Sequence, residues 1–230
     1  EELILHGLNL HRHQIYDAPS VAYVVRHSRK PTDLDLEERY ERRVKTLYAA
    51  IVDYTSRASS GRFDPEITDR IYSLRDVASN IVQAVKSVKH LRKNVLRYTT
   101  RDQGTVTELY DSLRTEIARI ILEIHKLSIA DPEIRSALWL EQERAQIEED
   151  ARATTRRIDS LIRSHELNPV AATSFMNDSI YAYGAMRELI QAARTYFVEQ
   201  DKAMAEVEQL LSLDDEVLGK DDNREDILHP

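Results

Sequence analysis

Apolar residues recur every three or four positions along most of the chain, which is the spacing of one helical face. The clearest series consists of Ile67, Ile71, Leu74, Ala78, Ile81, Val85 and Val88. The series is interrupted at Arg92 and resumes at Val95. It predicts one helix from Pro65 to about Arg101, on the order of 55 Å long. Such a helix needs long neighbours, because intrinsic propensity alone gives it little stability.

A shorter amphipathic stretch precedes this helix, starting after Thr32 or Asp33 and ending at Gly61. Its apolar stripe consists of Leu36, Tyr40, Val44, Leu47, Ile51, Tyr54 and Ala58. Asp64 and Pro65 then form a helix start, because Asp can cap free amides and Pro is tolerated at the first helical position.

Three more helices are predicted after the turn "RDQGT". The first has Thr105 as its candidate cap, and its stripe consists of Val106, Leu109, Leu113, Ile117, Ile120, Ile124 and Leu127. The second spans about 131–167 and starts with Asp-Pro. It has a weaker seam of Ala137, Leu140, Arg144, Ile147, Ala151, Thr154, Ile158 and Leu161. The third starts with Asn-Pro and spans about 168–211.

Five long helices joined by short turns predict an all-α fold, an antiparallel bundle in which sequential helices are neighbours. Two Asp-Pro starts and similar helix lengths suggest a duplicated helical unit. We expect the bundle to span residues 33–212. A lead-in with short helices occupies residues 1–32, and residues 213–230 form an acidic tail that we expect to be disordered.

The composition agrees with long helices and excludes several kinds of chemistry. Only five glycines and six prolines occur among 230 residues, which leaves little room for the turns of an all-β fold. The sequence has no cysteine, so disulfides, thiolate metal sites and a Cys nucleophile are excluded. No apolar run approaches the roughly 18–20 residues of a membrane span. The start of the chain lacks a signal-peptide layout, and we expect a soluble fragment of a longer protein.

The formal net charge of −8 is unevenly distributed along the chain. The tail at 213–230 carries seven acidic residues and two basic ones, so the remaining chain is only mildly acidic. Duplex nucleic acid is therefore not an expected partner.

Motifs of the common enzyme classes are missing from the sequence. None of His90, His125 and His165 has a Glu three residues before it, as di-iron bundles require. There is no phosphate-binding glycine loop and no Gly-x-Ser-x-Gly. His11 and His13 could bind a metal from an extended segment, but solvated histidines are the simpler interpretation. We therefore predict that the protein is not an enzyme and has no cofactor.

The stretch "TSFMNDSIYAYGAM" at 173–186 is unusual for the interior of a helix. At 100° per residue, one broad face carries Ala172, Phe175, Ser179, Ala182, Met186, Leu189, Ala193 and Phe197. Asn177, Tyr181 and Gly184 fall on the opposite side, where a surface helix carries Lys and Glu. We expect a central helix contacted on two sides. Asn177 and Asp178 then either bond side chains within the core or form a functional surface.

The segment "ATSFMNDSIYAYG", followed by "MRELIQAA", resembles the last long helix of the PhoU-like domain that ends bacterial sodium/phosphate cotransporter family proteins. Five residues match the Thr-Ser-x-x-Asn-Asp-x-x-Tyr pattern of that family: Thr173, Ser174, Asn177, Asp178 and Tyr181. The segment at 73–98, "SLRDVASNIVQAVKSVKHLRKNVLRY", resembles the long second helix of PhoU-like domains.

This resemblance implies a regulatory domain at the cytoplasmic face of the inner membrane. Residues 1–32 would link it to a membrane transporter domain of the same polypeptide, whose phosphate uptake it would modulate. Stand-alone PhoU proteins resemble each other in Glu/Asp-x-x-x-Asp repeats that hold iron or zinc, and this spacing puts two carboxylates on one helix face. Here only Asp222 and Asp226 have it. We therefore predict no metal site, and a stand-alone metal-binding regulator of phosphate signalling stays an alternative.

The predicted helix at 65–101 ends in a basic series, Lys86, Lys89, Arg92, Lys93, Arg97 and Arg101, with no acid between its members. Cations suit a helix C-terminus, and the acidic start of the helix at 131–167 could neutralise them within the bundle. The alternative is a surface that contacts anions, anionic lipid headgroups or loops of the transporter. A helical scaffold or a homodimer also stays open, because the apolar stripe at 67–88 is uninterrupted.

Overall fold

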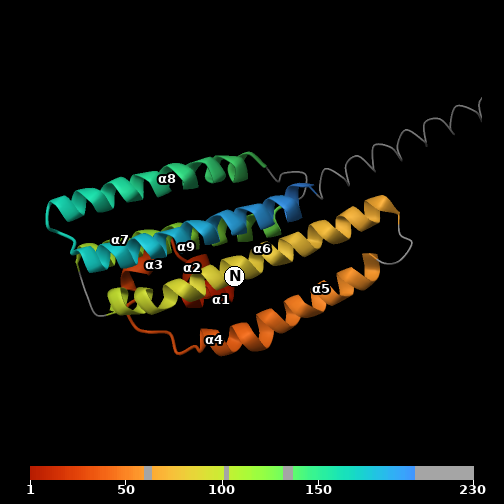
Figure 1. Ribbon diagram of the computed structural model, residues 1–230, viewed down its shortest axis with the longest axis horizontal. Helices are drawn as coiled ribbons and strands as arrows, with labels where there is room; N and C mark the ends of the chain where they lie inside the picture. Colours follow the sequence, from red (N-terminus) through yellow and green to blue (C-terminus); the bar gives the residue numbers. More distant parts are fainter. Residues whose placement is uncertain (60–63, 101–103, 132–136, 200–230) are drawn as a thin grey trace, which may run out of the picture.

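A computed structural model describes residues 1–59, 64–100, 104–131 and 137–199. Within these ranges the chain forms an all-α bundle, as the sequence predicts (Figure 1). The long helices are α5 (Thr46–Ser59), α6 (Pro65–Thr100), α7 (Thr105–Ile129), α8 (Ala137–Arg163) and α9 (Pro169–Ala193). The shorter elements are α1 (Glu2–Gly7), α2 (Arg12–Tyr16), α3 (Val21–His27), α4 (Leu36–Arg39) and two π-helical segments, η1 (Tyr40–Lys45) and η3 (Arg194–Glu199).

Helix α9 occupies the centre of the bundle. It packs against α6, α7 and α8, and Figure 1 shows it running between α8 and α6. Its buried positions include six alanines, whose small side chains allow neighbouring helices to come close: Ala171, Ala172, Ala182, Ala185, Ala192 and Ala193. The prediction of a central helix with neighbours in more than one direction is therefore confirmed, although Asn177, on the side where we expected a second neighbour, is exposed.

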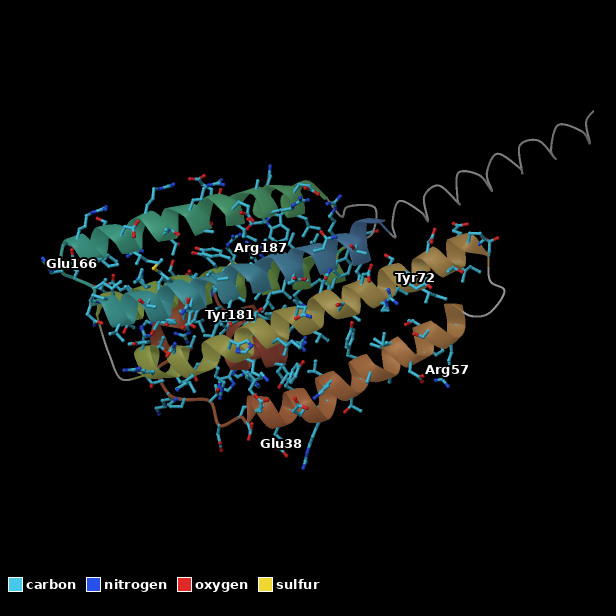
Figure 2. All side chains as sticks on the ribbon, in the orientation of Figure 1. Glu38, Arg57, Tyr72, Glu166, Tyr181 and Arg187 are labelled. Atoms are coloured by element: carbon cyan, nitrogen blue, oxygen red, sulfur yellow. The ribbon has the colours of Figure 1, made fainter. Side chains whose placement is uncertain are left out.

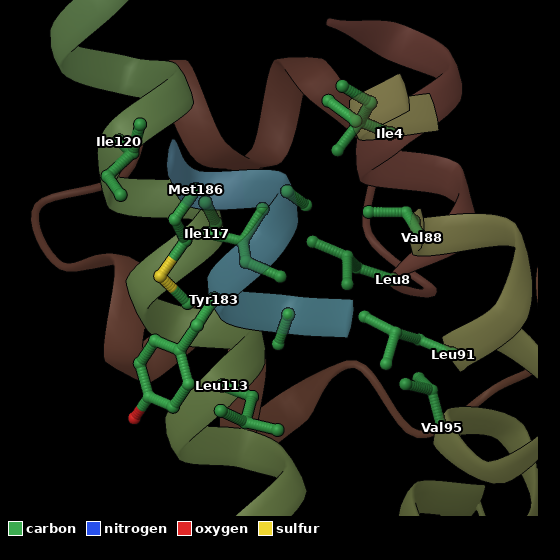
Figure 3. Close-up of a cluster of buried hydrophobic side chains, with 14 of the residues drawn as sticks. Ile4, Leu8, Val88, Leu91, Val95, Leu113, Ile117, Ile120, Tyr183 and Met186 are labelled. Atoms are coloured by element: carbon green, nitrogen blue, oxygen red, sulfur yellow. The ribbon is translucent and has the colours of Figure 1, made fainter. Parts of the chain in front are cut away.

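The core lies where α1, α6, α7 and α9 meet (Figure 3). Ile4 and Leu8 near the start of the chain pack with Val88 and Leu91 of α6 and with Ile117 of α7. None of these five side chains is more than 1% exposed. The lead-in at 1–32 therefore contributes to the same core as the long helices.

Arg114 of α7 forms buried hydrogen bonds with the backbone of the lead-in. It is completely buried, and its guanidinium donates hydrogen bonds to the carbonyl oxygens of Leu8 (2.8 Å), Asn9 (3.2 Å) and Val25 (3.2 Å). It also donates to Asp111 Oδ1 at 2.8 Å. Five planar donors suit this role, because a buried guanidinium needs partners in several directions.

Arg92 of α6 makes a second connection to the lead-in. Its guanidinium donates to the carbonyl oxygens of His6 (2.5 Å), Thr32 (3.1 Å) and Leu34 (2.9 Å). These hydrogen bonds explain why the apolar series of α6 is interrupted at Arg92. The interruption marks a polar connection between α6 and the start of the chain.

The expected stripe of the helix that begins near Leu36 is wrong at Leu47 and Tyr54, whereas its members Ile51 and Ala58 are half-buried. Leu47 and Tyr54 are 64% and 68% exposed, whereas Tyr48, Val52 and Thr55 face inward. The cause is η1, because a π-helical turn accommodates one extra residue and rotates everything after it around the helix axis. The inward face therefore moves on by one position.

The apolar series of α6 is buried only in its second half. Val85 and Val88 are in the core, but Ile67, Leu74 and Ile81 are 50%, 39% and 43% exposed. Figure 1 shows the reason, since the first part of α6 projects with α5 beyond α7 and α8. Ile67, Leu74 and Ile81 of the predicted stripe are therefore left partly open to solvent, whereas Ile71 and Ala78 are half-buried.

Three predicted helix starts can be compared with the structure, and α6 begins at Pro65 as expected. The side chain of Asn168 accepts a hydrogen bond from the Ala171 amide at 2.9 Å, which confirms the start of α9. The expected cap at Thr105 is wrong: Gly104 is the N-cap of α7 and has no side chain to accept a bond. Pro132, the predicted end near 211 and the acidic tail lie outside the described residues.

Candidate functional site

Asp178 is the polar centre of the bundle. It lies on α9, is only 5% exposed, and accepts two hydrogen bonds at one oxygen, Oδ2. Asn94 Nδ2 of α6 donates at 2.8 Å and the Tyr110 hydroxyl of α7 donates at 2.5 Å. A single carboxylate therefore links three helices.

Two aromatic rings pack against Tyr110, a donor to this carboxylate. The Tyr110 ring stacks on Tyr98 at a centroid distance of 5.2 Å and meets the edge of Phe175 at 5.1 Å. Burial raises the pKa of Asp178 above its ordinary value, although the bonds from Tyr110 and Asn94 oppose this. Burial and the bond to Asp178 also raise the pKa of Tyr110, so its hydroxyl stays protonated and remains the donor.

The other four residues of the family pattern lie nearer the surface. Thr173 is exposed and its hydroxyl donates to the Pro169 carbonyl of its own helix at 2.9 Å. Ser174 is half-buried and Asn177 is exposed. Tyr181 is 40% exposed and stacks on His90 of α6, with a centroid distance of 4.8 Å. Of the five residues of the pattern, only Asp178 therefore lies in the core. The side of α9 that bears Asn177 is exposed, although we expected a neighbour there.

This open side of α9 also carries apolar side chains. Val170 is 75% exposed, Ile180 66% and Met176 38%. A shallow hollow of about 370 Å³ lies beside Val170 and Asn177 at the start of the helix. Figure 2 shows the labelled Tyr181 where α9 meets α6.

The five basic residues of α6 proposed as a contact surface divide into two groups. Arg92 is committed to backbone carbonyls, and Lys89 donates to Glu37 Oε1 at 2.8 Å and lies over the Tyr40 ring at 4.6 Å. Lys86 is half-buried, whereas Lys93 and Arg97 are exposed. Arg101 lies outside the described residues. The outward basic surface is therefore smaller than the sequence suggests.

Glu116 of α7 is a half-buried acid that the sequence reasoning missed. Its Oε2 atom is buried without a hydrogen-bond donor, and its Oε1 accepts only from Ser112 at 3.2 Å. Burial, with the nearby Asp150 of α8, raises its pKa to about 7. Glu143 of α8 lies close but is engaged by Arg119, at 2.8 and 2.5 Å. Glu116 therefore titrates near neutral pH.

Arg114 and its partners were also missed. Asp111 accepts a hydrogen bond from Arg114. It also accepts one from each terminal nitrogen of Arg29, at 3.0 and 2.6 Å. A signal was present in the sequence, since Tyr110, Ile117 and Ala118 surround Arg114 at helical spacing. A lone Arg within an apolar face indicates a buried, fully bonded guanidinium.

No group of three or more His, Asp or Glu residues in the described ranges is arranged to hold a metal ion. The His11 ring stacks with His13 at 5.6 Å and meets His6 edge-on at 5.2 Å. Asp222 and Asp226, the pair with metal-ligand spacing, lie outside the described residues.

Comparison of the chain with protein-family models, with curated proteins and with solved structures gave no match. The class that the fold and the site define is an all-α bundle of long helices with a central helix fixed by one buried carboxylate. Among the helices of the described ranges, none has the length and apolarity needed to cross a bilayer.

Proposed function

We propose that this chain is a PhoU-like regulatory domain of a sodium-dependent phosphate transporter, acting at the cytoplasmic face of the inner membrane and not as an enzyme. The observation that carries the proposal is the position of the segment with the family pattern. It forms the first half of the central helix, and its Asp178 bonds both α6 and α7. The residues that resemble the pattern of a regulatory family therefore include Asp178, the side chain that links the three packed helices.

The proposed mechanism is a shift in this packing. Because α9 touches α6, α7 and α8, any displacement of α9 changes three contacts together. The raised pKa of Asp178 means that burial disfavours its charged form, so this arrangement of helices includes an electrostatic cost. We propose that α9 has a second packing in which Asp178 is less buried, and that a partner preferring one packing shifts the population towards it.

The reading frame and a transport assay test the proposal. We expect several membrane-spanning helices to be encoded upstream of Glu1 in the same polypeptide. In cells producing that polypeptide, deletion of this domain should change sodium-dependent phosphate uptake several-fold at equal transporter abundance.

A matched pair of variants sharpens the transport assay. Tyr110→Phe removes one bond to Asp178 and should alter uptake, whereas Tyr54→Phe removes an exposed hydroxyl and should leave it unchanged. An upstream frame without membrane spans, or uptake unaffected by deletion of the domain, would contradict the proposal.

A scaffold or dimerisation module is a second candidate, favoured by one observation. Six large apolar side chains on α5 and the first part of α6 are more than a third exposed: Leu47, Tyr54, Ile67, Tyr72, Leu74 and Ile81. If they form an interface, light scattering should give twice the mass of one chain. Leu74→Arg should then return the protein to a monomer, because a charge at an apolar interface is costly. A monomer at all concentrations would remove this candidate.

A further inference from the structure

The second half of α6 and the first half of α9 form one outward surface of basic and apolar side chains. We call it the basic–apolar face and define it by Lys86, Lys93, Arg97, Val170, Ile180 and Tyr181. The bond from Asn94 to Asp178 and the stacking of His90 on Tyr181 hold the two helices side by side. Figure 2 shows Tyr181 at their junction, on the side of the molecule in view.

The basic residues of this face share one side of α6. Lys86, Lys93 and Arg97 are seven and four residues apart, with His90 between the first two, so they form one stripe. Residues 84–100 contain no acid, and α9 contains none before Glu188 except the buried Asp178. The positive charge of the stripe is therefore not neutralised from α6 or α9.

Charge is also distributed unevenly along the whole bundle. Helices α6 and α8 run in the same direction in Figure 1. The first half of α8 is acidic, with Glu141, Glu143, Glu148, Glu149 and Asp150. Its second half is mainly basic, with Arg152, Arg156, Arg157 and Arg163. Arg152 and Arg156 pair with Glu149, and Asp159 is the one acid of this half, so α8 adds a small positive charge at the end where α6 carries Lys93 and Arg97. Positive charge at this end attracts an anionic surface.

The shape of the face favours a flat partner. Val170 and Ile180 project from a convex helix, and the hollow beside Val170 is too shallow to enclose a peptide helix. Scattered aliphatic side chains next to Lys and Arg suit the boundary between lipid headgroups and acyl chains, and Tyr is enriched there. Basic side chains add attraction to anionic headgroups.

We propose that the basic–apolar face docks on the surface of an anionic lipid bilayer. Lys86, Lys93 and Arg97 contact the headgroups, while Val170, Ile180 and Tyr181 enter the interface. Its biological setting rests on the proposed function, because a transporter domain works beside a membrane. The geometry and charge that support it do not depend on that setting.

Sedimentation of the 230-residue chain with vesicles tests the docking. The chain should sediment with vesicles of phosphatidylcholine plus phosphatidylglycerol at low salt, and lose this binding in phosphatidylcholine alone or at high salt. The double variant Lys93→Gln/Arg97→Gln should bind on the order of tenfold more weakly. Ile180→Ser should weaken binding several-fold without any change in charge.

A matched control removes the same charge elsewhere. Lys126 and Arg144 are exposed and lie towards the opposite end of the bundle, so Lys126→Gln/Arg144→Gln should bind like the unchanged chain. All altered side chains are exposed, and circular dichroism melting checks that each variant is folded. Absence of binding to anionic vesicles, equal binding of the two double variants, or unchanged binding of Ile180→Ser would overturn the inference.

These outcomes are separate from those of the uptake assay. A chain that does not bind vesicles could still regulate a transporter through direct helix contacts. Conversely, vesicle binding without any effect of the domain on phosphate uptake would support the docking face and contradict the proposed function.

Discussion

Asp178 shows how much of the architecture one side chain can fix. It accepts from α6 and α7 at the same oxygen, in surroundings that raise its pKa. Its partners are 84 and 68 residues away in sequence. The helical spacing placed Asp178 beside the inner face of its helix, but no periodicity within one helix can name a partner on another.

Removing the Tyr110 hydroxyl should destabilise the protein. Tyr110→Phe keeps the buried ring but leaves Asp178 with one donor, and we expect the free energy of unfolding to fall by about 1.5–3 kcal/mol, as for bonds to charged groups. Urea unfolding measures the change. Tyr54→Phe, at a side chain that is 68% exposed, should stay within about 0.5 kcal/mol.

Two glycines should respond oppositely to replacement by alanine. A Cβ at Gly184 would meet only Ser87 Oγ at 4.0 Å, an ordinary contact, so Gly184→Ala should stabilise the protein by about 0.5–1 kcal/mol. A Cβ at Gly7 would overlap Val88 Cγ1 and come within 3.2 Å of Leu36, so Gly7→Ala should cost about 1–3 kcal/mol. Thermal melts of both variants provide the check, and the same sign for both would contradict it.

At the scale of elements, the sequence predicted the long helices well and their exposed faces less well. Pro65 and Asn168 marked the starts of α6 and α9 correctly, because these signals depend only on local chemistry. The rotation introduced by η1 was not visible, since both alternatives on α5, Leu47 with Tyr54 or Tyr48 with Val52, are apolar. Only packing against α6 decides between them.

The short helices of the lead-in were expected from sequence, but their packing against the bundle could not be predicted, for a related reason. Its short helices have weak periodicity, and their fixation comes from Arg92 and Arg114 of distant helices. We therefore expect Arg114→Met to lower the free energy of unfolding by about 3–5 kcal/mol, because Asp111 and several carbonyl groups lose their partner in the interior.

Chemical denaturation of Arg114→Met measures this loss, and Arg157→Met is its control. Arg157 lies on the surface of α8, so its replacement should change stability by no more than about 0.5 kcal/mol. Equal stability of the two variants would show that the buried guanidinium does not hold the lead-in in place.

At the scale of the whole molecule, stability should depend on pH through Glu116. Its pKa is raised from 4.5 to about 7, so the stability that it contributes is complete below pH 4.5 and is lost as pH rises through 7. Glu116→Gln imitates the protonated form. The variant should match the original protein near pH 5 and melt about 2–6 °C higher at pH 8.

The difference in melting temperature between Glu116→Gln and the original protein cancels the pH-dependent contributions that both share. One of these has the opposite sign and comes from His6, whose pKa is lowered by burial. Glu108→Gln is the control, because Glu108 is exposed on the same helix. Its melting temperature should show no comparable gain at pH 8. A gain for Glu116→Gln that is equally large near pH 5 would contradict this assignment.

The attachment of the first residues to two different helices has a mechanical consequence. A force applied at Glu1 passes through the carbonyl groups held by Arg92 into α6 and through those held by Arg114 into α7. The segment therefore resists being peeled away one residue at a time. We expect it to move together with α6 and α7, and a pulling experiment should record one large rupture before any unravelling.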